Sequence, residues 1–123
     1  MKEIAVVILN WNGIELLKKF IPNTVNYSKE ANIYVIDNFS SDGSVEFLKT
    51  NHPNINVIEL DKNYGFAEGY NRGLKNVNEE IYCLLNSDIE VTENWLEPII
   101  KEFNNINTSI AQPIILDYKF RFI

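Results

Sequence analysis

The chain has 123 residues, of which 46% are hydrophobic and 12% aromatic, a composition that suits one packed domain and excludes a disordered tail. Its formal net charge is -6 and only 11 residues are Lys or Arg, which argues against a nucleic-acid partner because such partners require clustered cations. No apolar stretch has the length of a membrane span or of a signal-peptide core, so no transmembrane segment is expected. The single cysteine, Cys83, cannot form an internal disulfide, and the expected location is the cytoplasm.

The first half of the chain alternates strand-like and helical patterns. An apolar strand is expected over residues 5–9, followed by a helix over 14–25 in which Pro22 should kink or restart the helix. A second strand is expected over 32–36. A second helix should follow over 42–50, with Asp42 as its N-cap.

The second half continues the alternation. Residues 55–60 alternate apolar and polar side chains as an edge or half-buried strand does, and a helix should follow from Phe66, with Gly65, Gly69 and Gly73 near one face for close packing. The run 81–85 predicts the most clearly buried strand. A helix over 95–103, with Pro98 in its first turn, and a last parallel strand over 110–115 complete the pattern.

Strands that alternate with helices indicate an α/β, doubly wound, mainly parallel sheet. The apolar runs end in polar clusters at Asn10-Trp11-Asn12, at Asp37 and at Asn86-Ser87-Asp88. The carboxyl ends of parallel strands meet at one edge of a sheet, where ligands of open α/β sheets bind. We therefore expect the three clusters to face one cleft. A lone carboxylate beyond a strand, such as Asp88, suits a divalent metal held against a phosphorylated ligand.

Four segments of the chain resemble a known family. They are Val-Val-Ile-Leu-Asn-Trp-Asn-Gly at 6–13, Val-Ile-Asp-Asn-Phe-Ser-Ser-Asp-Gly-Ser at 35–44, Asn-Tyr-Gly-Phe-Ala-Glu-Gly-Tyr-Asn-Arg-Gly at 63–73, and Leu-Leu-Asn-Ser-Asp-Ile-Glu-Val at 84–91. In order and spacing they are similar to motifs of the inverting family 2 glycosyltransferases, especially the rhamnosyltransferase-like branch. The resemblance implies the Rossmann-like GT-A fold. Residues 1–123 would form its nucleotide-sugar-binding domain, truncated so that the C-terminal acceptor-binding half is absent.

The resemblance also implies roles for individual residues. The segment Asn10, Trp11, Asn12 and the carboxylate of Asp37 would hold the base of a nucleotide-sugar. Asn86-Ser87-Asp88 stands at the family's Asp-x-Asp motif, so Asp88 would bind Mn²⁺ or Mg²⁺ at the diphosphate while Asn86 hydrogen-bonds a ribose hydroxyl. The remaining nucleotide-sugar contacts are assigned to Asn63, Gly65 and Asn71.

Each assignment has a structural alternative. Trp11 can pack between a loop and the next helix, Asp37 can cap the turn at 40–44, and Asp88 can bond amides of its own turn. No residue of the chain matches the family's catalytic base, because that residue lies beyond the matched region. Glu90 and Glu93 are interpreted as exposed loop carboxylates rather than as that base.

The expected function is transfer of a sugar, with inversion, to the hydroxyl of a glycan or lipid-linked acceptor in cell-surface polysaccharide synthesis, which is compatible with peripheral membrane association of the intact enzyme. The alternative is a non-catalytic nucleotide-binding fragment or module. A dinucleotide-dependent oxidoreductase is disfavoured because Asn-Trp-Asn-Gly stands where its glycine-rich turn would follow the first strand. A phosphate-accepting receiver domain is disfavoured because Asn10 stands where its acidic pair would follow the first strand, and Ile115 stands where its lysine would end the fifth. Apolar residues at the end of the chain, Tyr118, Phe120 and Phe122, predict a homodimer.

Overall fold

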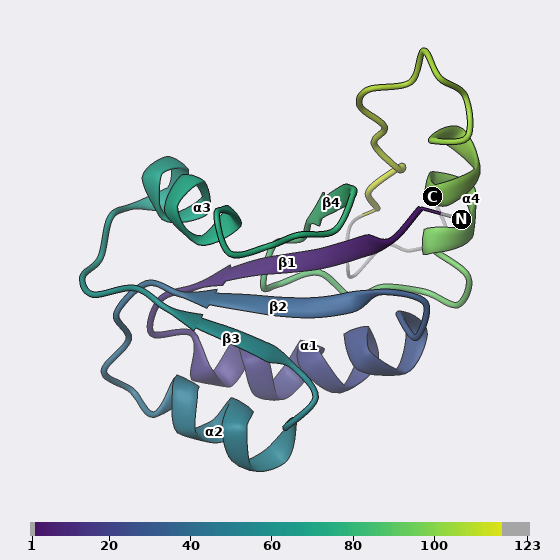
Figure 1. The fold of residues 1–123 in the computed structure, drawn as a ribbon. Helices are drawn as coiled ribbons and strands as arrows, with labels where there is room; N and C mark the ends of the chain where they lie inside the picture. The colour runs from purple at the N-terminus through teal and green to yellow at the C-terminus, as the bar shows by residue number, and fades with distance from the viewer. Residues whose placement is uncertain (1, 117–123) are drawn as a thin grey trace.

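The computed structural model describes residues 2–116, which form a four-stranded sheet with helices on both of its faces (Figure 1). All strand pairs are parallel and the strand order is β3-β2-β1-β4, which confirms the α/β doubly wound prediction. In chain order the elements are β1 (Ile4–Asn10), α1 (Ile14–Tyr27), β2 (Asn32–Asp37), α2 (Ser44–Asn51), β3 (Asn56–Glu59), α3 (Phe66–Leu74), β4 (Ile81–Leu84) and α4 (Leu96–Glu102).

The central strand β1 is buried on both faces because helices cover each of them. Figure 1 shows α1 and α2 below the sheet and α3 above it. Ile4, Val6 and Ile8 pack into the cluster that includes Leu17 of α1, whereas the intervening residues of β1 join a second cluster with Tyr70 of α3. This central strand and its neighbour β2 therefore form a rigid base for the loops that follow them.

Helix α3 lies close to the sheet because two of its residues are glycines. Gly69 and Gly73 are both buried, as their four-residue spacing predicts. A Cβ at Gly73 would stand 2.3 Å from Cδ1 of Ile36, and one at Gly69 would stand 3.0 Å from Nδ2 of Asn38. Gly65 has a different role from the one predicted. It is the N-cap residue with a φ of 80°, a left-handed value that favours glycine.

Pro22 was predicted to kink or restart the first helix, and the restart is wrong. Helix α1 runs unbroken from Ile14 to Tyr27 with Pro22 inside it. Packing on both sides of the proline explains this, since Ile21 and Thr24 are buried and the Asn23 side chain bonds to both the amide and the carbonyl of Val91. These tertiary contacts outweigh the lost backbone hydrogen bond.

The prediction that residues 81–85 form the most clearly buried strand is also wrong. Among residues 2–116, strand β4 pairs with β1 alone, and its side chains Tyr82 and Leu84 are 45% and 54% exposed. An apolar run cannot by itself distinguish a central strand from an outer one. Cys83 on the opposite face is half-buried, and burial raises the pKa of its thiol to about 11, which makes this cysteine unreactive at neutral pH.

The last predicted strand, over residues 110–115, is absent from the described part of the chain. These residues have no regular structure, and Ile110 and Ile114 are each 89% exposed. A strand requires a partner for its backbone groups, and no described segment pairs with this one. The apolar residues on which the homodimer prediction rests, Tyr118, Phe120 and Phe122, lie outside the described residues.

Asp42 joins the first turns of two helices. Its Oδ2 accepts a hydrogen bond from the Ile14 amide at 3.0 Å, and its Oδ1 accepts one from the Ser44 amide at 3.0 Å, although Gly43 is formally the N-cap residue. Burial alone would raise the pKa of this carboxyl, but the bonds from the Ser44 hydroxyl and from the two amides hold it below its ordinary value. The prediction of Asp42 as the N-cap is therefore wrong by one residue, but its carboxylate accepts a hydrogen bond from the first residue of both α1 and α2.

Replacing Asp42 by alanine is expected to lower the free energy of unfolding at pH 7 by about 1–2 kcal/mol, because two helix starts lose their acceptor. A carboxyl whose pKa is lowered in the folded state stabilises the fold at pH values above its unfolded-state pKa. This stabilisation is lost as the pH falls through the folded-state pKa. The difference between the variant and the unmodified chain should therefore shrink below pH 3.8. Urea denaturation at several pH values measures this, with the exposed Glu30→Ala as control. Equal losses in the two variants would contradict the capping role.

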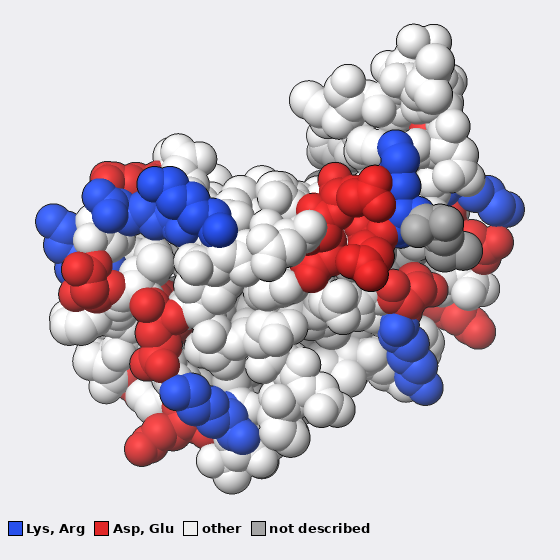
Figure 2. Space-filling view, in the orientation of Figure 1, with Lys and Arg blue, Asp and Glu red and all other residues white. Residues whose placement is uncertain are grey.

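Acidic side chains gather near the start of β4 on the face shown in Figure 2, where Glu79 and Glu80 precede the strand. Glu79 is 8% exposed and accepts a hydrogen bond from the Tyr34 hydroxyl at 2.7 Å. Burial, followed by this bond, raises the pKa of Tyr34 to about 12. The group lies near the amino-terminal edge of the sheet, away from the strand ends that concern the candidate site.

Within residues 2–116, no helix has both the length and the apolar character needed to cross a membrane.

Candidate functional site

The ends of β1 and β2 meet through their last residues. Asn10 and Asp37 are partners in the parallel register, and Asn10 Nδ2 donates to Asp37 Oδ1 at 3.0 Å. The Ser40 amide donates to the other carboxylate oxygen at 2.9 Å. Asn10 and Asp37 are only 1% and 2% exposed. The Asp37 carboxylate is therefore held in one orientation at the carboxyl edge of the sheet.

Ser40 ties the loop after β2 to the loop after β1. Its hydroxyl oxygen accepts hydrogen bonds from Asn10 Nδ2 at 3.3 Å and from the Asn12 amide at 2.9 Å. In return, the Ser41 amide donates to Asn12 Oδ1 at 2.7 Å. With both lone-pair positions of the Ser40 oxygen used by donors, its own hydrogen is available to a ligand.

Asn38 ties the same loop to the segment before α3. Its Nδ2 donates to the Gly65 carbonyl at 2.9 Å, and its Oδ1 accepts from the Tyr64 amide at 2.9 Å. Asn63 shapes that segment locally, since its Oδ1 accepts from the Gly65 amide at 2.8 Å. Asn38 and Ser40 were not among the predicted site residues. Two signals in the sequence pointed to them: their position directly after a strand that ends in an aspartate, and their place inside the family-like segment 35–44.

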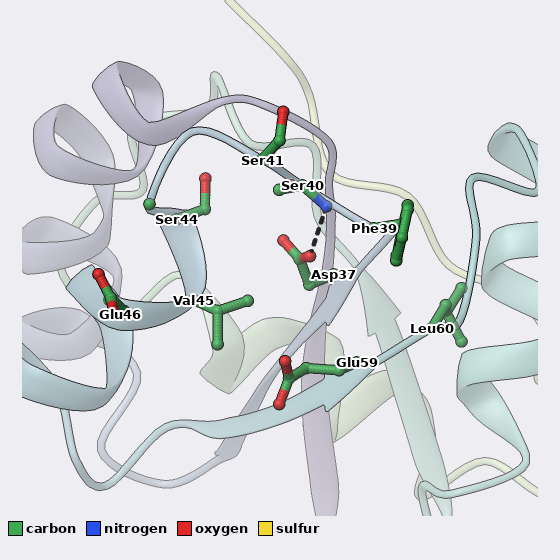
Figure 3. Close-up of a pocket in the computed structure, with 10 residues that line it drawn as sticks. Asp37, Phe39, Ser40, Ser41, Ser44, Val45, Glu46, Glu59 and Leu60 are labelled. Carbon is green, nitrogen blue, oxygen red and sulfur yellow. Dashed lines mark hydrogen bonds between the residues drawn. The ribbon is translucent and has the colours of Figure 1, made fainter.

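A pocket of about 340 Å³ opens beside Asp37 (Figure 3). Figure 3 shows Asp37 between Phe39 and Leu60 on one side and Ser44 and Val45 on the other. The lining contains carboxylates and serine hydroxyls but no Lys or Arg; its residues are Asp37, Phe39, Ser40, Ser41, Gly43, Ser44, Val45, Glu46, Glu59 and Leu60. A pocket of this composition suits a ligand that has hydrogen-bond donors and a flat apolar surface.

The structure brings together some of the predicted site residues and leaves others apart. Asn10 contacts Asp37, and Asn12 contacts the next loop, but of the predicted residues only Asp37 lines the pocket. Trp11 is 56% exposed rather than packed against a helix. The others are exposed: Asn63 and Gly65 precede α3, Asn71 lies within α3, and Asn86 and Asp88 follow β4.

Asp88 lies in a turn four residues beyond β4 and is exposed. Because β4 runs parallel to β1, this turn lies at the same carboxyl edge of the sheet as Asn10 and Asp37. Among residues 2–116, no hydrogen bond or ion pair engages the Asp88 carboxylate, and no group of three or more His, Cys, Asp or Glu residues is arranged to hold a metal ion. A metal here would be held by Asp88, with the Asn86 oxygen two residues away, and would complete its shell with phosphate and water, as Mg²⁺ commonly does.

Comparisons with known proteins agree with this architecture. The Glycosyl transferase family 2 model matches residues 5–121, and the chain therefore belongs to that family. The low-salt glycan biosynthesis hexosyltransferase Agl10 of Haloferax volcanii is 26% identical over 121 residues, which are 95% of this chain and 38% of the relative.

Two solved structures share the fold. The mannosyltransferase PcManGT from Pyrobaculum calidifontis, in complex with GDP-Man and Mn²⁺, has a TM-score of 0.62 at 21% identity over 71% of this chain and 28% of its own. Staphylococcus aureus TarS 1-349, in complex with UDP-GlcNAc, has a TM-score of 0.71 at 18% identity over 83% of this chain and 31% of its own. These similarities confirm the GT-A fold predicted from the sequence. The chain spans well under half the length of each of these three proteins.

Proposed function

We propose that this chain forms the donor-binding part of a glycosyltransferase that moves a sugar, with inversion, from a nucleotide-diphosphate sugar to a hydroxyl acceptor. The observation that carries the proposal is the Asp37 carboxylate, fixed by Asn10 and Ser40 at the mouth of a pocket on the carboxyl edge of the sheet. The GDP-Man and UDP-GlcNAc complexes of the two structural neighbours support the donor class.

In this proposal the chain's own residues bind and orient the donor. Asp37 accepts hydrogen bonds from the base, and the Asn10 amide keeps the carboxylate turned toward it. Trp11, Asn12, Asn63, Gly65 and Asn71 supply the surrounding contacts. No described carboxylate is assigned as the base that inversion requires.

Asp88 would hold Mn²⁺ or Mg²⁺, with Asn86 beside it. Such an ion stabilises negative charge on the departing diphosphate. The Asp88 carboxylate is exposed and has no hydrogen-bond or ion-pair partner in the described part of the chain, which supports this assignment, as does the Mn²⁺ in the complex of PcManGT.

The finer features of the function rest on the resemblance and on the relatives. We propose a rhamnosyltransferase-like branch, a cytoplasmic enzyme with peripheral membrane association, and a glycan or lipid-linked acceptor in cell-surface polysaccharide synthesis. The glycan-biosynthesis role in the name of the Haloferax relative supports the acceptor class. A homodimer remains a proposal, supported by exposed apolar side chains such as Ile110 and Ile114.

Thermal unfolding with UDP-, GDP- and dTDP-sugars, each with and without MnCl₂, tests the proposal. A ligand at about 100 times its Kd stabilises the folded state by about 2.7 kcal/mol, which raises the Tm by several degrees. We expect this rise with at least one nucleotide-sugar and none with NAD. A rise with NAD alone would contradict the proposal. Binding without release of the nucleoside diphosphate in the presence of acceptors would favour the non-catalytic module instead.

A further inference from the structure

The backbone at Phe39 has a conformation that its residue type disfavours. Its φ is 68°, and the other non-glycine residues with positive φ in residues 2–116 are Asn12 and Asn94. Asparagine tolerates the left-handed region, but a bulky aromatic residue there is unusual. The Phe39 side chain is 60% exposed, so burial in the core does not explain why a phenylalanine occupies this position.

Hydrogen bonds on both sides hold Phe39 in this conformation. Asn38 is anchored to the Gly65 carbonyl and the Tyr64 amide, and the Ser40 amide is anchored to Asp37. A strained residue persists where its surroundings fix the backbone, and such residues concentrate at functional sites. The fixed backbone directs the Phe39 side chain to the edge of the pocket.

In Figure 3 the Phe39 ring and Leu60 lie on the opposite side of Asp37 from Val45. All four residues line the pocket of about 340 Å³. A planar ligand whose polar edge meets the carboxylate would therefore have an aromatic face available at its side. Aromatic side chains commonly provide stacking surfaces for nucleobases.

We infer that Phe39 is the residue on which the base of the donor nucleotide stacks, a role that rests on the proposed function and adds a specific contact to it. The hydrogen bonds on both sides hold the strained backbone, and the strained backbone places the ring where the base would bind. Removing the ring should therefore weaken the binding of ligands that have a base and leave the binding of ligands without a base unchanged.

The test uses isothermal titration of the 123-residue chain with UDP, GDP and dTDP in the presence of Mn²⁺, and with pyrophosphate as the ligand that has no base. Phe39→Ala and Phe39→Gly should each lower the affinity for the tightest-binding of the three nucleotides by about 5- to 150-fold, which is the range for the loss of one base-stacking contact. Phe39→Trp should keep the affinity within about threefold, since it retains an aromatic face. Pyrophosphate binding should be the same in all variants.

The two ring-deleting variants also separate the ring from the backbone. Glycine relieves the positive φ and alanine does not, so Phe39→Gly should melt about 2–8 °C above Phe39→Ala while binding the nucleotide equally weakly. The matched control is Phe66→Ala, because Phe66 is 67% exposed and does not line the pocket. Its nucleotide affinity should equal that of the unmodified chain.

Unchanged nucleotide affinity in Phe39→Ala would overturn the stacking role and leave the proposed function standing. An equal loss of pyrophosphate affinity, or an equal loss of nucleotide affinity in Phe66→Ala, would also overturn it, because the effect would then not depend on the base or on this ring. If the unmodified chain binds none of the nucleotides, the proposed function fails, and the stacking role fails with it.

Discussion

Replacing Asp88 by asparagine is expected to remove most of the contribution of Mn²⁺ to nucleotide binding. The carboxylate is exposed and unengaged within residues 2–116, so the substitution breaks no internal contact and should leave the Tm of the free chain unchanged. A unit charge about 4 Å from another is worth about 4 kcal/mol near a protein surface before desolvation is subtracted. We expect the affinity for UDP or GDP in Mn²⁺ to fall by about 10- to 100-fold, and the affinity measured in EDTA to stay the same.

Two further variants make the Asp88 result specific. Glu93→Gln removes an exposed carboxylate from the same connection between β4 and α4, and it should leave Mn²⁺-dependent binding unaltered. Asn86→Asp adds a carboxylate two residues before Asp88 and should strengthen Mn²⁺ binding, because a hard cation prefers anionic oxygen ligands. Titration calorimetry of all three variants distinguishes a metal ligand from a general effect of surface charge. Equal losses in Asp88→Asn and Glu93→Gln would contradict the metal role.

The parts of the fold that local patterns determine were predictable from the sequence. The alternation of apolar runs with helical patterns predicted the parallel α/β order, and the four-residue spacing of Gly69 and Gly73 predicted the close approach of α3. The meeting of Asn10 and Asp37 also follows from the sequence, because residues that end neighbouring parallel strands lie side by side. Whether these two residues serve a ligand stays a prediction.

The remaining features depend on contacts between distant parts of the chain. Residues 81–85 were predicted as a buried strand and 110–115 as a last strand, but burial and pairing depend on which strands become neighbours, and the local pattern does not contain that information. The site was incompletely predicted for the same reason. Asn38 and Ser40 matter because they bridge to loops 26 and 28 residues away, and the exposed position of Phe39 depends on a φ that its residue type disfavours.

Replacing Gly73 by alanine is expected to destabilise the fold by about 1–3 kcal/mol, although alanine favours a helix by about 1 kcal/mol over glycine. The added Cβ would stand 2.3, 2.5 and 2.7 Å from Cδ1, Cγ1 and Cγ2 of Ile36, well below normal carbon contact distances. Ile36 is fully buried in β2, which is paired on both sides, so the clash must move α3 instead. Urea denaturation measures the loss, and a stability equal to or above that of the unmodified chain would contradict this packing.

Gly69→Ala and the Ile36 double mutant complete the test of the α3 packing. A Cβ at Gly69 meets side-chain ends, Asn38 Nδ2 at 3.0 Å and Leu9 Cδ1 at 3.2 Å, so its loss of stability should be smaller than that of Gly73→Ala. Ile36→Ala removes all three clashing atoms but leaves a cavity, with an expected loss of about 2–5 kcal/mol. The double variant Ile36→Ala/Gly73→Ala should lose less stability than the sum of the losses of the two single variants, by at least about 1 kcal/mol. The reason is that the methyl group added at residue 73 fills space that the isoleucine side chain vacated. Simple additivity would mean that α3 does not rest on Ile36. Since Ile36 directly precedes Asp37, the same contact holds the end of β2 where the candidate pocket begins.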